Sequence, residues 1–274
     1  MNNNENSGIF DLSVILPTYN ESATIAKMLD LLKTTIPSEI NTEVIVIDDD
    51  SPDKTSNIVN SYIQKSAGKI SFRIQTRKNK RGLSSAIIDG INIAKGKFIL
   101  VMDSDFSHPP QVIATIFDQL ENYGFDIVIG SRFVEGGISK GWPLTRRLMS
   151  KVANQLSKMW LGINVNDSMS GFFALRKDLI KNLSFEAIGY KILLEILVKT
   201  KGAKVKEVPF VCINRQEGAS KFSFSIINDY IKLLKILRKN VSYNAKNRVK
   251  FSRVFICLKE TNHLISERGT SLFS

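Results

Sequence analysis

A regular alternation of short apolar runs with helical patterns is the feature that most constrains the fold. Five runs rich in β-branched and aliphatic residues recur in the first half of the chain, at 12–16, 43–47, 70–75, 98–102 and 126–130. Helical patterns lie between them, at 25–32, 55–64, 82–94 and 110–122. Strands that alternate with helices at this pace form βα units and a mostly parallel sheet. We therefore expect an α/β fold with a mostly parallel central sheet flanked by helices.

The pattern changes after residue 130. Two basic amphipathic helices are predicted there, at 144–160 and 224–239. Three further elements are expected, an extended segment, a helix and a strand, at 170–175, 190–200 and 205–213. Pro209 cannot donate a ladder hydrogen bond, so the last of these is predicted to be an edge strand.

Charge is divided unevenly along the chain. Residues 1–130 contain 12 Lys and Arg against 16 Asp and Glu, whereas residues 131–274 contain 26 against 10. The first part therefore has a net charge of −4 and the second a net charge of +16, within a total of +12. A basic half is expected to meet an anion, such as nucleic acid, a membrane surface or a phosphorylated ligand. Because its basic residues fall on amphipathic helices, a membrane is favoured and nucleic acid is not expected as a partner.

Composition indicates a globular protein of the cytosol. Hydrophobic residues make up 43% of the chain and charged residues 23%. No stretch approaches the roughly 20 apolar residues of a membrane span. The polar N-terminus lacks the basic and apolar regions of a signal peptide. Cys212 and Cys257 lack metal-ligand spacing and fit a reducing compartment. We expect a peripheral protein on the cytoplasmic face of a membrane.

Polar clusters follow four of the predicted strands, where parallel sheets bind ligands. They contain Asn20 and Glu21, then Asp48 to Asp50, then Asp103 and Asp105, then Ser131 and Arg132. Side chains at i and i+2 of an extended segment point the same way, so Asp103 and Asp105 are expected side by side. Paired carboxylates repel each other unless a cation neutralises them. Hard oxygen ligands suit Mg²⁺ or Mn²⁺, which they usually share with a substrate phosphate.

Several common kinds of site are excluded by what the sequence lacks. It has neither the Gly-x-Gly-x-x-Gly pattern of dinucleotide-binding proteins nor the Gly-Lys-Ser/Thr ending of a P-loop. The only histidines, His108 and His263, offer no Ser-His-Asp set. His108 follows the paired aspartates and is expected to support that site or the local structure.

Five motifs in this order resemble those of the family-2 glycosyltransferases. They are Pro17-Thr18-Tyr19-Asn20-Glu21, Asp48-Asp49-Asp50-Ser51-Pro52-Asp53, Asp103-Ser104-Asp105, Gly130-Ser131-Arg132 and Arg215-Gln216-Glu217-Gly218-Ala219-Ser220-Lys221. The stretches 130–137 and 170–176 resemble those of the dolichol-phosphate mannose synthases in particular. The resemblance covers residues 12–240. It implies a GT-A nucleotide-sugar fold, the donor GDP-mannose and the acceptor dolichyl (polyprenyl) phosphate.

The resemblance also implies roles for individual residues. The donor nucleotide would be bound by Pro17, Tyr19, Glu21, Ile47, Asp49, Met102, Asp103, Arg215 and Lys221. The metal would be held by Asp103, Asp105 and Ser107, the last standing where the family usually has Gln. The lipid phosphate would be bound by Arg132, Arg146 and Ser150. Asp105 and Arg132 are the expected catalytic residues.

The implied chemistry agrees with these residue types. A lipid phosphate is already ionised at neutral pH, so it needs positioning more than a general base. The fork of an arginine matches phosphate geometry better than a lysine does. Since no nucleophilic side chain is placed to form a covalent intermediate, we expect a single displacement with inversion.

The expected organisation is one glycosyltransferase domain over 9–240, after a disordered lead at 1–8 and before a basic tail at 241–274. Family members often continue into transmembrane helices at this point, and some end as soluble subunits held by membrane partners. A membrane-anchoring subunit is therefore a further expected partner. Two alternatives stay open: another donor such as UDP-glucose, or a non-enzymatic relative that binds membrane or nucleic acid.

Overall fold

The protein is described here by a computed structural model that covers residues 10–79, 81–186, 189, 191–213 and 224–240. All of these belong to one compact unit, Met1–Asn240. The lead predicted at 1–8 and the tail predicted at 241–274 lie outside the described residues.

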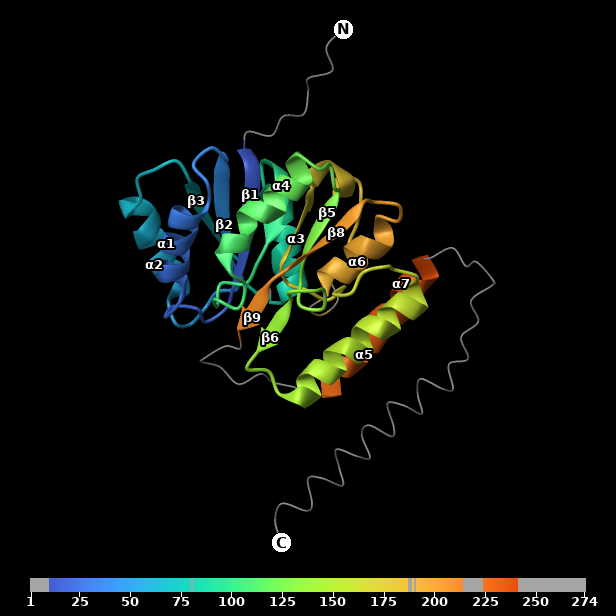
Figure 1. The fold of residues 1–274 in the computed structure, drawn as a ribbon. Coiled ribbons are helices and arrows are strands. Elements are labelled where there is room, and N and C mark those ends of the chain that lie inside the picture. Colours follow the sequence, from blue (N-terminus) through green and yellow to red (C-terminus); the bar gives the residue numbers. More distant parts are fainter. Residues whose placement is uncertain (1–9, 80, 187–188, 190, 214–223, 241–274) are drawn as a thin grey trace. The chain divides into compact units, whose positions relative to one another are not determined.

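A seven-stranded sheet in the order β3-β2-β1-β4-β7-β5-β8 forms the centre of the unit (Figure 1). Its strands are β1 (Phe10–Thr18), β2 (Thr42–Asp48), β3 (Ser71–Thr76), β4 (Gly96–Val101), β5 (Ile127–Ser131), β7 (Phe173–Arg176) and β8 (Val205–Pro209). Only β7 runs antiparallel to its neighbours, β4 and β5. The other neighbouring pairs are parallel. The predicted mostly parallel sheet is confirmed.

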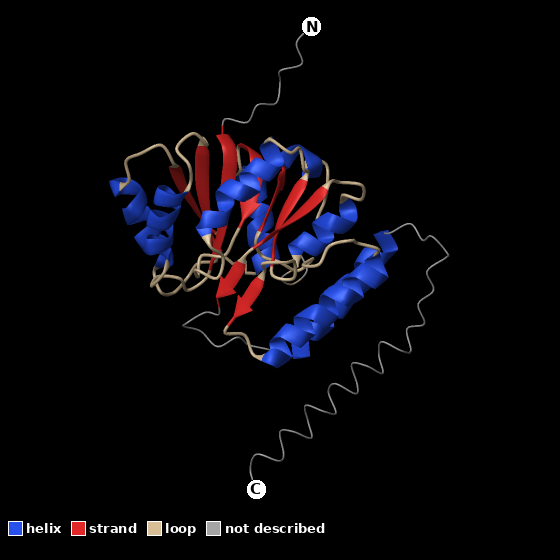
Figure 2. Ribbon diagram, viewed as in Figure 1, coloured by secondary structure: helices blue, strands red, loops and turns tan. Residues whose placement is uncertain are grey.

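Helices cover both faces of this sheet (Figure 2). They are α1 (Ile25–Thr35), α2 (Thr55–Lys65), α3 (Leu83–Ile93), α4 (Ile113–Glu121) and α6 (Ile192–Lys199), with short 3-10 turns at Pro110–Val112 and Lys177–Ile180. Val14 and Leu16 of β1 pack with α1, α2 and α4, whereas Ile15 packs with α3 and α6. Successive side chains of a strand point to opposite faces, so the apolar run of β1 supplies both core layers.

The strand predicted over 205–213 is wrong as a single element. β8 ends at Pro209, and β9 (Val211–Ile213) leaves the main sheet to pair in parallel with β6 (Ile138–Lys140). Phe210 joins the two, since its N–H donates to Ser131 O (3.2 Å) and its carbonyl accepts from Ile138 N–H (3.1 Å). Proline cannot continue a ladder on its N–H side, which explains the change of sheet at this point. The predicted edge position of β8 is correct.

The two basic amphipathic helices are α5 (Leu144–Leu161) and α7 (Phe224–Asn240), and they contact each other. Tyr230 Oη donates to Ala153 O across this contact (2.6 Å). Leu233, Leu234 and Leu237 of α7 are buried, so this part of its apolar side packs within the protein. Within the described part of the chain, no helix has the length and apolar character needed to cross a membrane.

A buried carboxylate links the first strands of the sheet. Glu43 Oε1 accepts hydrogen bonds from Ser13 Oγ (2.6 Å) and from the backbone N–H of Lys95, and Oε2 pairs with Arg73. Ser13 Oγ in turn accepts from the N–H of Gly96 (2.8 Å). The Glu43 side chain has no exposed surface. Both oxygens of this buried carboxylate are therefore satisfied, Oε1 by Ser13 and Lys95 and Oε2 by Arg73.

Glu43→Leu should lower the free energy of unfolding by about 3 kcal/mol, because the buried Ser13 hydroxyl, the Lys95 N–H and the Arg73 guanidinium lose the carboxylate that they share. Urea unfolding measures this loss. The matched control is Glu121→Leu, which removes an ion pair to Lys97 whose two side chains are 38% and 41% exposed. That control should cost at most about 1 kcal/mol. Equal losses in the two variants would contradict the role given to Glu43.

Candidate active site

The loop after β1 is held in place by the loop after β2. The backbone N–H groups of Asn20, Glu21 and Ser22 donate to Ser51 Oγ, Thr55 Oγ1 and Asp53 Oδ2 at 3.0, 3.0 and 2.9 Å. Asp48, fully buried, accepts from Thr18 Oγ1 (3.0 Å) and Ser51 Oγ (2.6 Å). Two acids of the motif at 48–53, Asp48 and Asp53, therefore serve to shape these loops.

Asp49 lies at the predicted nucleotide end and is engaged by neighbouring groups. Arg77 Nε donates to its Oδ1 (2.7 Å), and the N–H of Gly82 donates to its Oδ2 (2.9 Å). Arg77 is itself buried and also reaches Ser85 Oγ (2.9 Å). A carboxylate has about four acceptor positions, so Asp49 keeps capacity for a ribose or base donor. Sequence reasoning missed Arg77, which follows β3 without any motif of its own.

The other predicted nucleotide residues differ in how accessible they are. Tyr19 is 43% exposed, and the guanidinium of Arg81 lies 5.0 Å from its ring centroid. Pro17 is buried in β1, and Ile47 and Met102 are fully buried in the two core layers. Ile47 and Met102 can therefore support the site from behind but present no side-chain surface to a ligand. Arg215 and Lys221 lie outside the described residues.

Asp103 and Asp105 follow β4, but the backbone that carries them is not the extended segment that was predicted. β4 ends at Val101, residues 104–108 form a bend, and Phe106 has a φ of 62°. The alternation of a strand therefore does not govern where the two carboxylates point. Both aspartates are half-buried, and the N–H of Ser107 donates to Asp105 Oδ1 (3.0 Å). Among the described residues, no group of three or more His, Cys, Asp or Glu is arranged to hold a metal ion.

Arg132 follows β5 and forms a two-pronged ion pair with Asp167. Its Nε lies 2.8 Å from Oδ2 and its Nη2 lies 2.7 Å from Oδ1, while its backbone N–H donates to Oδ2 (3.0 Å). Asp167 is fully buried. Burial alone would lower the pKa of Arg132, but the hydrogen bonds and charge of Asp167 raise it above its ordinary value. No local pattern in the sequence pointed to Asp167.

Trp142 brings the two predicted phosphate-binding arginines together. The guanidinium carbons of Arg146 and Arg132 lie 3.8 and 5.0 Å from its ring centroid. Ser150 is half-buried, one turn further along α5. Just before α6, burial and then the charge of Arg132 lower the pKa of Lys191 to about 8. Sequence reasoning missed both Trp142 and Lys191.

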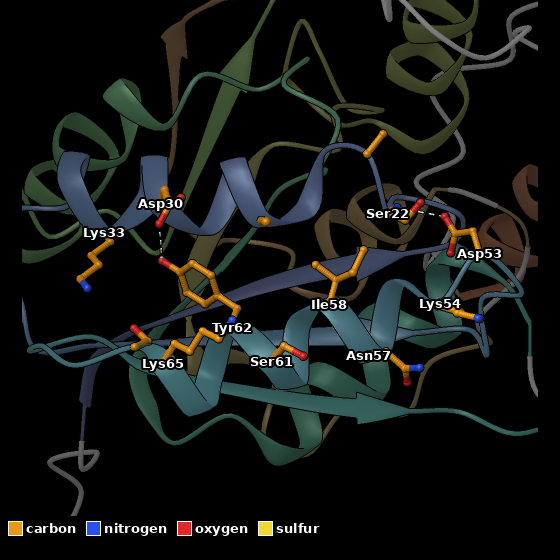
Figure 3. A pocket seen from close by; sticks show the side chains of 13 residues that line it. Ser22, Asp30, Lys33, Asp53, Lys54, Asn57, Ile58, Ser61, Tyr62 and Lys65 are labelled. Carbon is orange, nitrogen blue, oxygen red and sulfur yellow. Dashed lines mark hydrogen bonds between the residues drawn. The ribbon is translucent and has the colours of Figure 1, made fainter.

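A separate groove lies between α1 and α2 (Figure 3). It has a volume of about 820 Å³ and is lined by residues of both helices and of the turns beside them, from Ser22 to Ser66. Tyr62 Oη donates to Asp30 Oδ1 on its wall (2.9 Å), and partial burial together with that carboxylate raises the pKa of Tyr62 to about 12. None of the predicted site residues lines this groove, so it is distinct from the candidate active site.

Comparison with known proteins agrees with the sequence motifs. A dolichol-phosphate mannosyltransferase of Pyrococcus furiosus is 40% identical over 230 residues, which are 83% of this chain and 64% of that protein. The match thus spans less than two thirds of that relative's length. A dolichol-phosphate mannosyltransferase of Saccharomyces cerevisiae is 36% identical over 238 residues, covering 83% of this chain and 86% of the relative.

Solved structures share the fold at lower identity. Glucosyl-3-phosphoglycerate synthase from Mycobacterium tuberculosis, in complex with Mn²⁺, UDP-glucose and phosphoglyceric acid, is 18% identical with a TM-score of 0.65, covering 86% of this chain and 82% of that one. A mannosyltransferase from Pyrobaculum calidifontis, in complex with GDP-Man and Mn²⁺, is 19% identical with a TM-score of 0.58. The match covers 84% of this chain and 63% of that one. The predicted GT-A fold is confirmed. Residues 13–184 match the model of "Glycosyl transferase family 2", and the chain belongs to this family.

Proposed function

We propose that the protein transfers mannose from GDP-mannose to dolichyl or another polyprenyl phosphate, with inversion at the anomeric carbon. The observation that carries this proposal is the convergence of Arg132 and Arg146 on Trp142. Gly171 faces Asp103, and the preceding Ser170 donates to the carbonyl of Gly130, two residues before Arg132. The basic corner formed by Arg132 and Arg146 therefore adjoins the predicted metal-binding loop. The two mannosyltransferase relatives support the choice of donor sugar and acceptor.

The basic corner suits an anionic acceptor. Nε and one hydrogen of Nη2 of Arg132 are directed to Asp167, while Nη1 makes no hydrogen bond to any described residue. Asp167 thus holds the guanidinium still, and its remaining N–H groups can meet a phosphate oxygen. Arg146 would add a second fork and Ser150 a hydroxyl. Since the phosphate is already charged, these groups orient it toward the donor sugar and need not remove a proton.

The donor would lie along the ends of β1, β2 and β4. Tyr19, Glu21 and Asp49 would bind the guanine and ribose end, with Pro17, Ile47 and Met102 behind them. Arg215 and Lys221, outside the described residues, would close over the donor. Asp103 and Asp105 supply hard oxygen ligands that fit Mg²⁺ or Mn²⁺, with Ser107 as a third ligand. The cation, when bound, stabilises the charge of the departing diphosphate.

The proposal places the protein on the cytoplasmic face of a membrane, where the lipid acceptor resides, with a membrane-anchoring subunit as a partner. On α5, Leu144 and Leu148 are 79% and 50% exposed, one helical turn apart. Arg147 and Lys151 are exposed beside them. Apolar side chains rimmed by basic ones favour the boundary between head groups and acyl chains. This surface of α5, rather than the buried leucines of α7, would meet the lipid.

Arg146→Ala should raise the KM for dolichyl phosphate by roughly 10- to 100-fold, the value of a lost charge-assisted hydrogen bond. Affinity for GDP, measured by calorimetry, should stay unchanged. Arg176→Ala is the matched control, because Arg176 pairs with Asp178 at the surface and is not one of the predicted site residues. Equal weakening of GDP binding and of acceptor use would assign Arg146 to the donor instead. Calorimetry with UDP in place of GDP tests the alternative donor.

Asp105→Asn should reduce metal-dependent mannose transfer by at least roughly 100-fold, since a neutral amide is a poor ligand for a hard cation. Transfer is followed as release of GDP with Mg²⁺ or Mn²⁺ at saturating concentration. Asp178→Asn serves as control, because the Asp178 side chain is 58% exposed and pairs with Arg176 at the surface. Full activity of the Asp105 variant would show that this residue is not a metal ligand.

Asp167→Asn should destabilise the protein and weaken acceptor use together. The substitution leaves the buried Arg132 charge without its counter-charge, and the loss of stability is expected to be about 3 kcal/mol in urea unfolding. The KM for dolichyl phosphate should rise because the guanidinium is no longer held in one orientation. A variant that unfolds more easily yet keeps its KM would separate the stability role of the pair from the positioning role.

A further inference from the structure

His108 is a buried histidine that the proposed chemistry does not use. It ends the bend at 104–108 and is 6% exposed. Its Nδ1 accepts a hydrogen bond from the backbone N–H of Asp103 at 2.9 Å, and the same atom lies 3.9 Å from Asp103 Oδ2. A ring nitrogen that accepts a hydrogen bond carries no proton, so the proton of the neutral ring is on Nε2.

This hydrogen bond is made by the first residue after β4 that no longer pairs with β1. The N–H of Met102 still donates to Ile15 O of the neighbouring strand (3.2 Å). The next N–H, that of Asp103, donates to His108 instead. The imidazole thus takes the place of the neighbouring strand as acceptor, at the residue where the chain turns away from β4. It sets the direction in which Asp103 leaves the sheet.

The imidazole itself is held by aromatic rings on two sides. It stacks on Phe172, with ring centroids 5.2 Å apart and an interplanar angle of 13°. Phe210 meets its edge at 5.6 Å and 72°. Phe172 and Phe210 are both buried, and they contact each other at 5.5 Å. Such packing leaves the ring little freedom to rotate, so the direction of Nδ1 is fixed.

Gly171 provides the space that this arrangement needs. A Cβ atom at Gly171 would lie 3.1 Å from His108 Cε1 and 3.6 Å from Asp103 Oδ2. A side chain there would press on the imidazole, whereas its distance to the carboxylate is that of an ordinary van der Waals contact. The lack of a side chain at Gly171 therefore allows His108 and Asp103 to lie close together.

We infer that His108 is a positioning residue for the divalent cation, acting through the backbone of Asp103. The inference rests on the proposed function, since it takes Asp103 as a ligand of the cation. Partners that orient a metal ligand commonly alter metal affinity by roughly 10- to 100-fold when they are removed. His108 does not touch the cation or the substrates in this account. Its contribution is the orientation of Asp103.

Two substitutions separate the hydrogen bond from the packing of the ring. His108→Phe keeps an aromatic ring between Phe172 and Phe210 but has no acceptor. His108→Asn loses the ring but places an amide oxygen near the position of Nδ1. In the full-length protein with saturating GDP, Mn²⁺ affinity is measured by electron paramagnetic resonance. We expect His108→Phe to weaken Mn²⁺ binding by roughly 10-fold or more and His108→Asn to retain most of it.

Three further measurements complete the test. GDP affinity without metal should be the same in both variants and in the unsubstituted protein, and a matching loss there would overturn the inference as a general structural effect. Unchanged Mn²⁺ affinity in a folded His108→Phe variant would also overturn it. Gly171→Ala should weaken Mn²⁺ binding in the same direction. Asp103→Asn checks the premise: normal Mn²⁺ affinity in that variant would refute the proposed metal site itself, independently of His108.

Discussion

The insertion of β7 between β4 and β5, antiparallel to both, is the constraint on which the site depends. It separates the carboxyl ends of β4 and β5 by two strand spacings, about 10 Å. Its own beginning lies at that same edge. Phe172 O accepts from the N–H of Gly130 (2.8 Å), and Ser170 Oγ donates to Gly130 O (2.7 Å). Gly171 faces Asp103 and His108. The start of β7 thus links the aspartate loop to the strand that presents Arg132.

Buried charges at this edge are held in pairs that orient them. Arg132 is fixed by Asp167, and Asp49 is fixed by Arg77. Burying two charges costs desolvation energy that their attraction only partly offsets, so such pairs are weak evidence of stability gained. Their consequence here is geometric. Each pair leaves one functional group in a single orientation with hydrogen-bonding capacity to spare, which is what binding a nucleotide or a phosphate requires.

Much of the fold could be predicted from local patterns. Each of the five strands expected in the first half of the chain is present, with ends within two residues of those predicted. The spacing of apolar residues and the positions of turn residues are local properties of the chain, so they were enough to locate these strands. The separation of β8 and β9 was missed because Pro209 indicates an edge but not which new partner the chain finds beyond it. β6 was missed because a strand of three residues has too little pattern to detect.

The sequence by itself determined the α/β class, the family, and the strand ends at which the acids and arginines stand, because these depend on local periodicity and on motifs. Only the tertiary structure decided which groups meet. Trp142 contacts two arginines from different elements, and Asp167 reaches Arg132 from 35 residues away. Phe172 and Phe210 hold the imidazole of His108. Contacts between distant segments follow from how the layers pack, and no local pattern in the chain encodes them.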